Sequence, residues 1–249
     1  MFSLLVFPLA FLPSLIWLLF YLRKDVHPEP NRLIIRVFLW SLLITTLVAL
    51  AIFGIQEAKT LLINRGIDIK SILPPFLALP FIIVLFNAFW EEILKYLVVH
   101  FSILKNKHFD EPVDAMEYMI IAALAFAAVE NVLISFRYES LIGLGNILFA
   151  RFLGATFIHA LSSAIVGFFL ARAIFHKKNR KRFPLAINFV LIGLLIASGL
   201  HGIFNFLIIK SENLSNPVYL YLIAVFLVFL SVVVTRAFRR LNIQSLKKN

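Results

Sequence analysis

The chain alternates between long apolar blocks and short polar connections, and this pattern determines its predicted fold. Seven of the blocks are long enough for a helix to cross a bilayer, which takes ~20 residues. We place these spans at about residues 2–22, 33–55, 75–104, 115–136, 147–175, 184–209 and 217–238. The sequence therefore predicts an all-α, polytopic transmembrane helix bundle of about seven spans, with six to eight as the range.

The first and third blocks, and the connection between the second and third, depart from a simple pattern. Pro8 and Pro13 lie inside the first span and are expected to kink it, because each removes a backbone hydrogen bond. The mixed polar residues 56–71 are expected to hold a short interfacial helix. The third span exceeds the length that a crossing requires, so we expect it to be tilted, broken near Pro80 or extended beyond the membrane.

Lysine and arginine are unevenly distributed between the connections, which predicts the orientation of the bundle. Connections on one side carry fifteen of the 24 basic residues, and those on the other side carry five. Because basic connections stay in the cytoplasm, we predict an N-terminus outside and a C-terminus in the cytoplasm. Arg23 and Lys24 follow the first span and no basic residue precedes it, so we expect a retained span rather than a cleaved signal peptide.

Composition supports a membrane protein and excludes several kinds of chemistry. The 249 residues are 61% hydrophobic and only 15% charged, whereas soluble domains carry ~25% charged residues. This length suits one integral membrane domain over residues 1–249. The net charge of +11 is explained by the basic connections, and nucleic acid is not an expected partner, because no basic stretch is interleaved with aromatic residues outside the apolar blocks. The absence of cysteine excludes disulfides, thiol catalysis and cysteine-bound metals.

Polar side chains interrupt four of the predicted spans. Each charge near the bilayer centre costs at least ~2.5–3.5 kcal/mol, so such residues face protein and indicate function. Helical spacing places Glu91 with Lys95, and His201 with Asn205, on shared faces where they can pair. The full set is Glu91, Glu92, Lys95, Glu130, Asn131, Arg151, His159, His201 and Asn205.

The predicted topology brings the charged and histidine members of this set to a similar depth. Glu130, His201 and His159 lie about seven, eight and twelve residues from the outer ends of their spans, at ~1.5 Å per residue. Glu91 lies roughly ten to sixteen residues from the outer start of its span at the same rise. All four fall in the outer half of the membrane or near its midplane, so they can meet.

This set suits hydrolysis of an amide bond inside the membrane. Two adjacent buried carboxylates resist simultaneous ionisation, so one can take a proton from water near neutral pH. A histidine can hold the same water or protonate the leaving amine. An asparagine amide or a second histidine can stabilise the oxyanion.

Other mechanisms lack their residues, although some alternatives stay open. There is no HExxH motif of zinc proteases and no GxSxG serine motif, so Ser162 and Ser163 are expected to be small packing residues. Residues 143–146 lack the aspartate of a GxGD site. Two histidines with glutamates can bind zinc or iron, so a metal-dependent protease is an alternative. A proton- or ion-coupled transporter and a non-catalytic membrane scaffold are alternatives of another class.

The order of the motifs resembles the PrsW intramembrane proteases, within the larger group of CAAX prenyl endopeptidases and bacteriocin-processing proteins. The matching motifs span about residues 87–206, and we place the catalytic core at about residues 75–209. They are Glu91-Glu92-x-x-Lys95, Asp114, Phe126-x-x-x-Glu130-Asn131, Arg151 with His159, Gly167, and His201-x-x-x-Asn205.

The resemblance implies a metal-independent, glutamate-type endopeptidase without a cofactor in a bacterial inner membrane, with zinc as the alternative. One of the paired glutamates would act as the base on a bound water, and the asparagine would help to stabilise the oxyanion. The implied catalytic residues are Glu91, Glu92, His159, His201 and Asn205. The implied supporting residues are Lys95, Glu130, Asn131 and Arg151.

The resemblance also implies a substrate class. PrsW-like proteins are associated with site-1 cleavage of membrane-bound anti-sigma factors, so a single-span membrane protein is the expected partner. The depth of the polar set favours a cut near the outer boundary of the membrane. The CAAX group has arginine one residue later than Lys95 and a histidine in its second motif, so Lys95 and Glu130-Asn131 favour the PrsW branch. CAAX-type cleavage is kept as an alternative.

Overall fold

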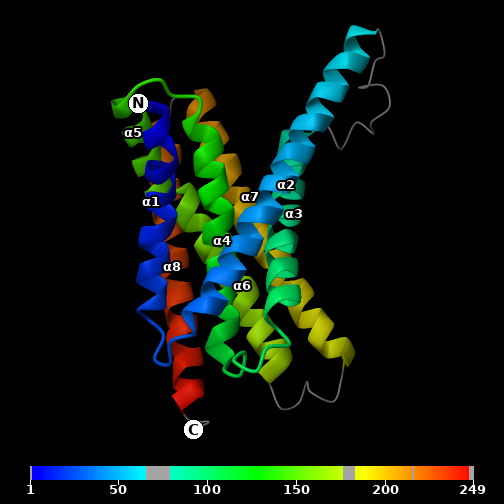
Figure 1. Cartoon of the computed structure of the whole chain (residues 1–249), viewed down its shortest axis with the longest axis vertical. Coiled ribbons are helices and arrows are strands. Elements are labelled where there is room, and N and C mark those ends of the chain that lie inside the picture. Colours follow the sequence, from blue (N-terminus) through cyan, green and yellow to red (C-terminus); the bar gives the residue numbers. More distant parts are fainter. Residues whose placement is uncertain (1, 66–78, 176–182, 215, 247–249) are drawn as a thin grey trace.

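A computed structural model describes residues 2–65, 79–175, 183–214 and 216–246 of the chain. Within these ranges it contains helices and no strand. The helices are α1 (Phe2–Leu22), α2 (Asn31–Asn64), α3 (Pro80–Ser102), α4 (Pro112–Ser135), α5 (Leu141–Leu153), α6 (Ala155–Phe175), α7 (Phe183–Leu214) and α8 (Pro217–Leu246). They form a bundle in which α1 begins at one end and α8 finishes at the other (Figure 1).

The predicted polytopic, all-α membrane bundle is confirmed. Six segments have the length and hydropathy of membrane spans, with α5 and α6 counted together as Leu141–Phe175. α3 is a further long apolar helix that carries the charged residues Glu91, Glu92 and Lys95. It packs against α2, α4, α6 and α7, and both Glu92 and Lys95 are fully buried. The protein is therefore a multi-pass membrane protein whose most charged helix is enclosed by others.

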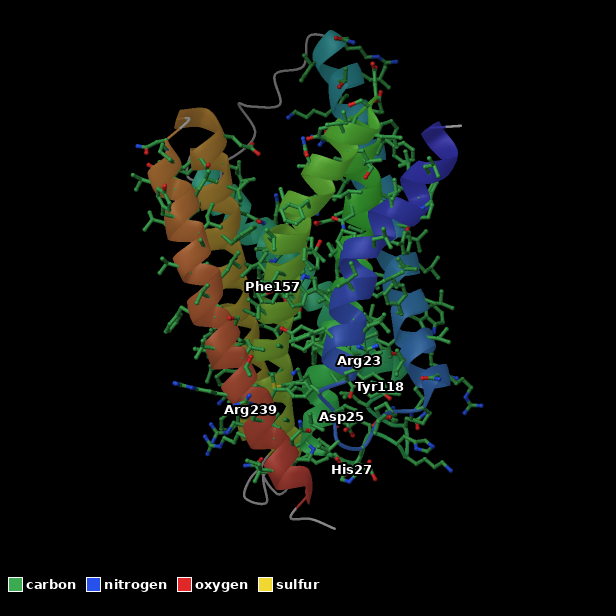
Figure 2. The ribbon with its side chains drawn as sticks, turned by 90° about the vertical axis from the view of Figure 1, so that its left-hand side faces the viewer. Arg23, Asp25, His27, Tyr118, Phe157 and Arg239 are labelled. Atoms are coloured by element: carbon green, nitrogen blue, oxygen red, sulfur yellow. The ribbon has the colours of Figure 1, made fainter. Side chains whose placement is uncertain are left out.

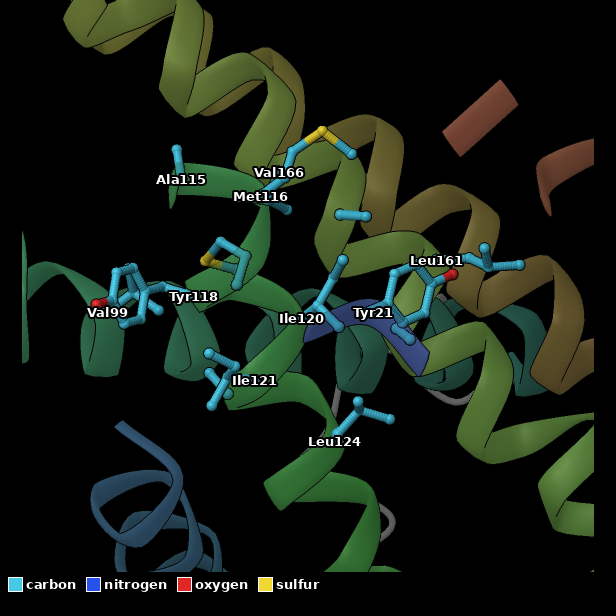
Figure 3. Close-up of a cluster of buried hydrophobic side chains, with 14 of the residues drawn as sticks. Tyr21, Val99, Ala115, Met116, Tyr118, Ile120, Ile121, Leu124, Leu161 and Val166 are labelled. Carbon is cyan, nitrogen blue, oxygen red and sulfur yellow. The ribbon is translucent and has the colours of Figure 1, made fainter. Parts of the chain in front are cut away.

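Helix α4 forms the centre of the bundle. Every residue from Pro112 to Val129 is buried, and α4 packs against α1, α2, α3, α5, α6 and α8. Its many alanines allow neighbouring backbones to approach closely, as is usual between membrane helices. Figure 3 shows side chains of α4, including Ile121, in one buried hydrophobic cluster with Tyr21 of α1, Val99 of α3 and Leu161 of α6. Residues carried by α4 can therefore reach several partners at once.

The second span is longer than predicted. α2 continues to Asn64, so residues 56–64 extend this helix rather than forming a separate interfacial one. This stretch contains neither proline nor glycine, and its side chains favour a helix. The rest of the predicted interfacial segment, and the predicted start of the third span at Pro75, lie outside the described residues. α3 begins at Pro80, where a break was one expectation.

The span predicted for residues 147–175 lies within one candidate membrane segment, Leu141–Phe175, but it is not one continuous helix. The chain forms α5 and α6 there, and α5 already begins at Leu141. The break falls at Gly154, where the backbone leaves helical geometry with φ −115° and ψ −90°. A Cβ atom at this position would lie 3.3 Å from the Phe204 ring, so the close approach of α7 favours glycine.

The remaining helix ends agree with the sequence to different degrees. The first and fourth spans agree to within a turn, and α1 runs through Pro8 and Pro13 as one helix. α7 and α8 extend past their predicted ends to Leu214 and Leu246. Their additional turns are polar or basic, so hydropathy marks where the apolar block stops rather than where the helix stops.

The connection between α1 and α2 folds against the start of α4 through buried acidic groups. The Tyr118 hydroxyl donates a hydrogen bond to Glu29 Oε2 at 2.7 Å, and His27 Nδ1 lies 3.0 Å from the Glu111 carboxylate. Figure 2 shows Asp25, His27 and Tyr118 together at this end of the bundle. Burial raises the pKa of Glu29 to about 7, the Tyr118 hydrogen bond lowers it, and the facing carboxylates of Asp25, Asp110 and Glu111 raise it.

Replacing Gly167 with alanine is expected to destabilise the bundle. The new Cβ would lie 2.5 Å from the Ala115 carbonyl oxygen and 2.5 Å from Met116 Cα, which are backbone atoms of α4. Overpacking of this kind costs about 1–3 kcal/mol, so thermal unfolding in detergent should occur at a lower temperature. Gly54→Ala is the control, because a Cβ at Gly54 meets nothing within 4 Å. An equal loss in both variants would contradict the packing explanation.

Glu29→Gln is expected to reduce the loss of stability at alkaline pH. The folded-state pKa of about 7 lies above the ordinary 4.5, so the folded protein binds this proton more tightly than the unfolded chain. The resulting stabilisation is fully present below the ordinary pKa and is lost as the pH rises through the folded value. Wild type should lose up to about 3 kcal/mol of unfolding free energy between about pH 5 and pH 8 that Glu29→Gln retains.

Thermal unfolding profiles across this pH range test the expectation for Glu29. Glu57→Gln is the control, because Glu57 is an exposed glutamate on α2. Parallel profiles for wild type and both variants would show that Glu29 does not contribute.

Candidate active site

Five helices bring the predicted polar residues together inside the bundle. Direct side-chain contacts join all of them except Asn205. Asn205 lies one turn after His201, is half-buried, and forms no hydrogen bond among the described residues. α3 supplies Glu91, Glu92 and Lys95, α4 supplies Glu130 and Asn131, α5 supplies Arg151, α6 supplies His159, and α7 supplies His201 and Asn205.

Glu92 is completely buried and accepts hydrogen bonds from four side chains. Its Oε1 atom contacts Lys95 Nζ at 2.7 Å, Ser162 Oγ at 3.0 Å and His201 Nδ1 at 3.1 Å, and its Oε2 atom contacts Ser163 Oγ at 2.6 Å. Both oxygens of this carboxylate therefore accept hydrogen bonds, three at Oε1 and one at Oε2. Because an ionised carboxylate only accepts, the proton of the His201 ring lies on Nδ1.

Lys95 connects Glu92 to the rest of the network. This lysine is fully buried, and its ammonium group also donates to His159 Nδ1 at 2.9 Å. Because His159 Nδ1 is an acceptor, its ring proton lies on Nε2, which donates to Glu130 Oε2 at 2.9 Å. A continuous chain of hydrogen bonds thus runs from α3 through α6 to α4.

Arg151 and Asn131 hold the far end of this chain. Arg151 Nη2 donates to Glu130 Oε2 at 2.9 Å, and Arg151 Nε donates to Asn131 Oδ1. Asn131 Nδ2 in turn donates to Thr156 Oγ1 at 3.2 Å. Glu130 is therefore paired with a guanidinium group, as Glu92 is paired with an ammonium group.

Glu91 is the glutamate of this site without a cation at hydrogen-bonding distance among the described residues. Its Oε2 atom is buried and has no hydrogen-bond partner. The ring nitrogens beside that atom are His201 Nε2 at 3.7 Å and His159 Nδ1 at 3.9 Å. The Glu91 side chain is 21% exposed and that of Glu92 is 0% exposed. Of the two adjacent carboxylates, only Glu91 belongs to a partly exposed side chain and has an oxygen without a hydrogen-bond partner.

Aromatic rings enclose the charged groups. The rings of His159 and His201 meet edge to face, with centroids 4.5 Å apart. Phe126 packs beside His159 with centroids 5.7 Å apart, and its ring lies 4.9 Å from Lys95 Nζ. A cation over an aromatic ring is attracted by the ring quadrupole, so Phe126 offsets part of the cost of burying Lys95.

Three residues of the site are potential metal ligands. Glu91, His159 and His201 each offer one ligand atom, and these atoms lie within 4.8 Å of one another. However, Nδ1 of His159 faces the Lys95 ammonium group and Nε2 of His159 faces Glu130. The free ligand atoms are Glu91 Oε2 and His201 Nε2, whereas a catalytic zinc has three protein ligands. The arrangement does not fit a zinc centre unless Lys95 moves away.

Two sequence predictions are wrong in detail. The spacing predicts that Lys95 pairs with Glu91, four residues away, but Lys95 pairs with Glu92, three residues away. Ser162 and Ser163 are predicted to be packing residues, but both donate hydrogen bonds to Glu92. The signal for these serines is weak, since their spacing puts only Ser163 on the same helix face as His159. Sequence reasoning also missed Thr156, the partner of Asn131.

Comparison with known proteins shows which family this chain resembles over most of its length. A family model described as "PrsW family intramembrane metalloprotease" matches residues 29–233. Protease PrsW of Geobacillus kaustophilus is 30% identical over 205 residues, which cover 82% of this chain and 80% of the relative. Protease PrsW of Bacillus subtilis is 28% identical, with coverage of 85% and 83%. Protease PrsW of Oceanobacillus iheyensis is 32% identical, with coverage of 79% of both chains.

No solved structure matches this chain. The family match spans the helices that carry all nine polar residues of the site. The resemblance noted in the sequence motifs is thus confirmed over most of the chain. This protein belongs to the PrsW family of intramembrane proteases.

Proposed function

We propose that this protein is a glutamate-type endopeptidase in which Glu91 activates the attacking water. The observation that carries the proposal is the difference between two adjacent glutamates. Glu92 is engaged by four donors, whereas Oε2 of Glu91 has no partner. A general base needs a free lone pair within hydrogen-bonding reach of the proton that it removes. Glu91, with a partly exposed side chain and a free oxygen, meets this requirement, whereas Glu92 is fully enclosed by protein.

The proposed reaction uses Glu91 first as a base and then as an acid. Its carboxylate removes a proton from water while the water oxygen bonds to the carbonyl carbon of the substrate. The carbonyl oxygen becomes an oxyanion, to which the amide group of Asn205 donates a hydrogen bond. Glu91 then gives its proton to the amide nitrogen as the C–N bond breaks. The products are a new carboxyl terminus and a new amino terminus.

The other polar residues act by positioning. Glu92 fixes the His201 ring through Nδ1, so the lone pair on Nε2 faces the oxygen of Glu91 and can accept the second proton of the same water. Lys95 supplies the positive charge that Glu92 needs in the apolar interior. His159, which Lys95 and Glu130 hold from both sides, forms the wall opposite His201.

The proposed mechanism needs no metal ion. The description of the matching family includes a metalloprotease, but the residues present do not fit one in this arrangement. A zinc ion on His159 Nδ1 would take the place of the hydrogen bond from Lys95 and bring two positive charges together. The proposal therefore assigns the activation of water to Glu91 alone.

The proposed substrate is a single-span membrane protein of the anti-sigma factor kind, cut near the outer boundary of the membrane. A groove of about 500 Å³ between α2 and α3 supports a transmembrane helix as the substrate. Its walls include Trp40, Leu94 and Phe101, and Leu94 lies one turn from Glu91 on α3. An apolar helix packs into such a groove through side chains on one face, which would bring its end close to the proposed base.

Glu91→Gln is expected to reduce cleavage by about 10²–10⁴-fold, because it removes the base while keeping the side-chain volume. The temperature of thermal unfolding should stay unchanged, because Oε2 of Glu91 makes no hydrogen bond in the fold. The assay is cleavage of single-span reporter proteins in proteoliposomes, with unfolding measured on the same preparations. Cleavage at the wild-type rate by Glu91→Gln would reject the assignment.

Glu92→Gln is the matched comparison, since the two residues are adjacent and chemically identical. It should also lose cleavage, but it should unfold at a lower temperature than wild type. The change leaves Lys95 buried without its carboxylate, and breaking a buried ion pair costs about 3–5 kcal/mol. Equal thermal stability of the two variants would contradict the division of roles.

Cleavage is expected to survive a strong metal chelator, because no step of the proposed mechanism uses a metal. Wild-type protein in proteoliposomes would be assayed with and without chelator, and then after addition of zinc. Loss of cleavage with chelator and its recovery with zinc would overturn the metal-independent mechanism. In that case His159 would have to release Lys95, which a change in the distance between these two side chains would reveal.

A further inference from the structure

A second groove lies between α6, α7 and α8, apart from the candidate active site. Its volume is about 450 Å³, within the range of ~300–1,000 Å³ that ligand pockets occupy. Apolar side chains form most of its walls, among them Phe168, Leu200, Phe229 and Val233. Phe229 and Val233 are exposed on the surface of the bundle. The groove therefore opens toward the lipid of the membrane.

Two arginines line the same groove. Arg236 and Arg240 lie one turn apart on α8, and both are exposed. The guanidinium group of Arg172 lies nearby, over the ring of Phe168 that lines the groove, at 5.4 Å from the ring centroid. These residues belong to the ends of α6 and α8 that the distribution of basic residues places on the cytoplasmic side. An apolar groove thus joins a basic patch where phospholipid headgroups lie.

We propose that this groove binds one anionic glycerophospholipid. Water does not fill a groove of this kind in the hydrocarbon layer, because its apolar walls offer no hydrogen bonds, so an acyl chain is the occupant that matches them. Arginine binds phosphate through paired N–H donors, and Arg236 and Arg240 are placed to share one phosphate. Basic pockets between membrane helices on the cytoplasmic side recognise anionic headgroups. Two positive charges favour a headgroup with a net negative charge over a zwitterionic one.

The occupied groove would contact the helices that hold the site. Leu200 lines the groove and directly precedes His201, and Ala164 lines it and directly follows Ser163. Ser163 and His201 both donate hydrogen bonds to Glu92. The lipid therefore packs against the same turns of α6 and α7 that fix this carboxylate. Lipid binding can be measured without any proteolysis, so its outcome is independent of whether the proposed function is correct.

The first test measures lipid binding to the full-length protein in detergent by native mass spectrometry. Phosphatidylglycerol should be retained in preference to phosphatidylcholine. Arg236→Gln and Arg240→Gln should each weaken binding of phosphatidylglycerol roughly fivefold, and together about 25-fold. Arg239→Gln is the matched control, because Arg239 is an exposed arginine on the same turn of α8 but does not line the groove (Figure 2). An equal effect of Arg239→Gln would show attraction to surface charge alone and overturn the site.

A second test fills the groove without changing its charge. Val233→Trp should displace phosphatidylglycerol, because Val233 lines the groove, whereas Val232→Trp should not, although Val232 is equally exposed on α8. Soluble glycerol phosphate should fail to compete, because it lacks the acyl chain that the apolar walls accommodate. Unchanged binding by Val233→Trp, effective competition by glycerol phosphate, or equal retention of phosphatidylcholine would each overturn the proposal. Thermal unfolding of every variant establishes that the fold is retained.

Discussion

The cost of burying charge in an apolar bundle governs the arrangement of its central helices. Lys95 has no exposed surface, and an unpaired charge there would cost at least ~2.5–3.5 kcal/mol. α3 supplies one partner of Lys95, Glu92, and α6 supplies the other, His159. The remaining hydrogen bonds to Glu92 come from α6 and α7. Glu130 of α4 likewise depends on Arg151 of α5. No single one of these helices supplies all the counter-charges and hydrogen bonds that its own charged side chains need. The helices must therefore pack together in one arrangement that brings these partners into contact.

This constraint also explains how one fold holds two adjacent carboxylates differently. A fully buried carboxylate with donors on both oxygens is well held and out of reach of water. Glu92 is in that state, and it orients His201 as a result. The next residue, Glu91, points its free oxygen at the same histidine and has no cation of its own. A firmly held carboxylate and a carboxylate with a free oxygen thus lie side by side, as the proposed mechanism requires, and Glu92 helps to fix Lys95 and His201 beside Glu91.

The sequence predicts the polytopic helical bundle and most of the polar residues that the structure brings together, because long apolar blocks and the charges inside them can be read directly. It does not distinguish Glu91 from Glu92, since a lysine three or four residues later can pair with either on a helix. The donors that decide this, Ser162 and Ser163, look like ordinary packing residues in an apolar helix. A lone glycine in such a helix is also tolerated, so Gly154 gives no clear sign of a break. The sequence does not predict these features because they depend on contacts with a second helix, and spacing along one helix carries no information about its neighbours.

The break at Gly154 shows how a contact with a second helix affects the site. In an uninterrupted helix the backbones of Arg151 and His159 would be about 12 Å apart along the axis, at ~1.5 Å per residue. In the structure both side chains bind the same oxygen of Glu130, each at 2.9 Å. Because α5 ends at Leu153 and α6 starts anew at Ala155, the two residues can approach this oxygen from different helices. The guanidinium group then compensates the carboxylate that orients His159, while the other ring nitrogen of His159 accepts from Lys95 and lies 3.9 Å from Glu91 Oε2. A glycine that looks like a minor interruption in an apolar run therefore links the supporting arginine to the candidate catalytic centre.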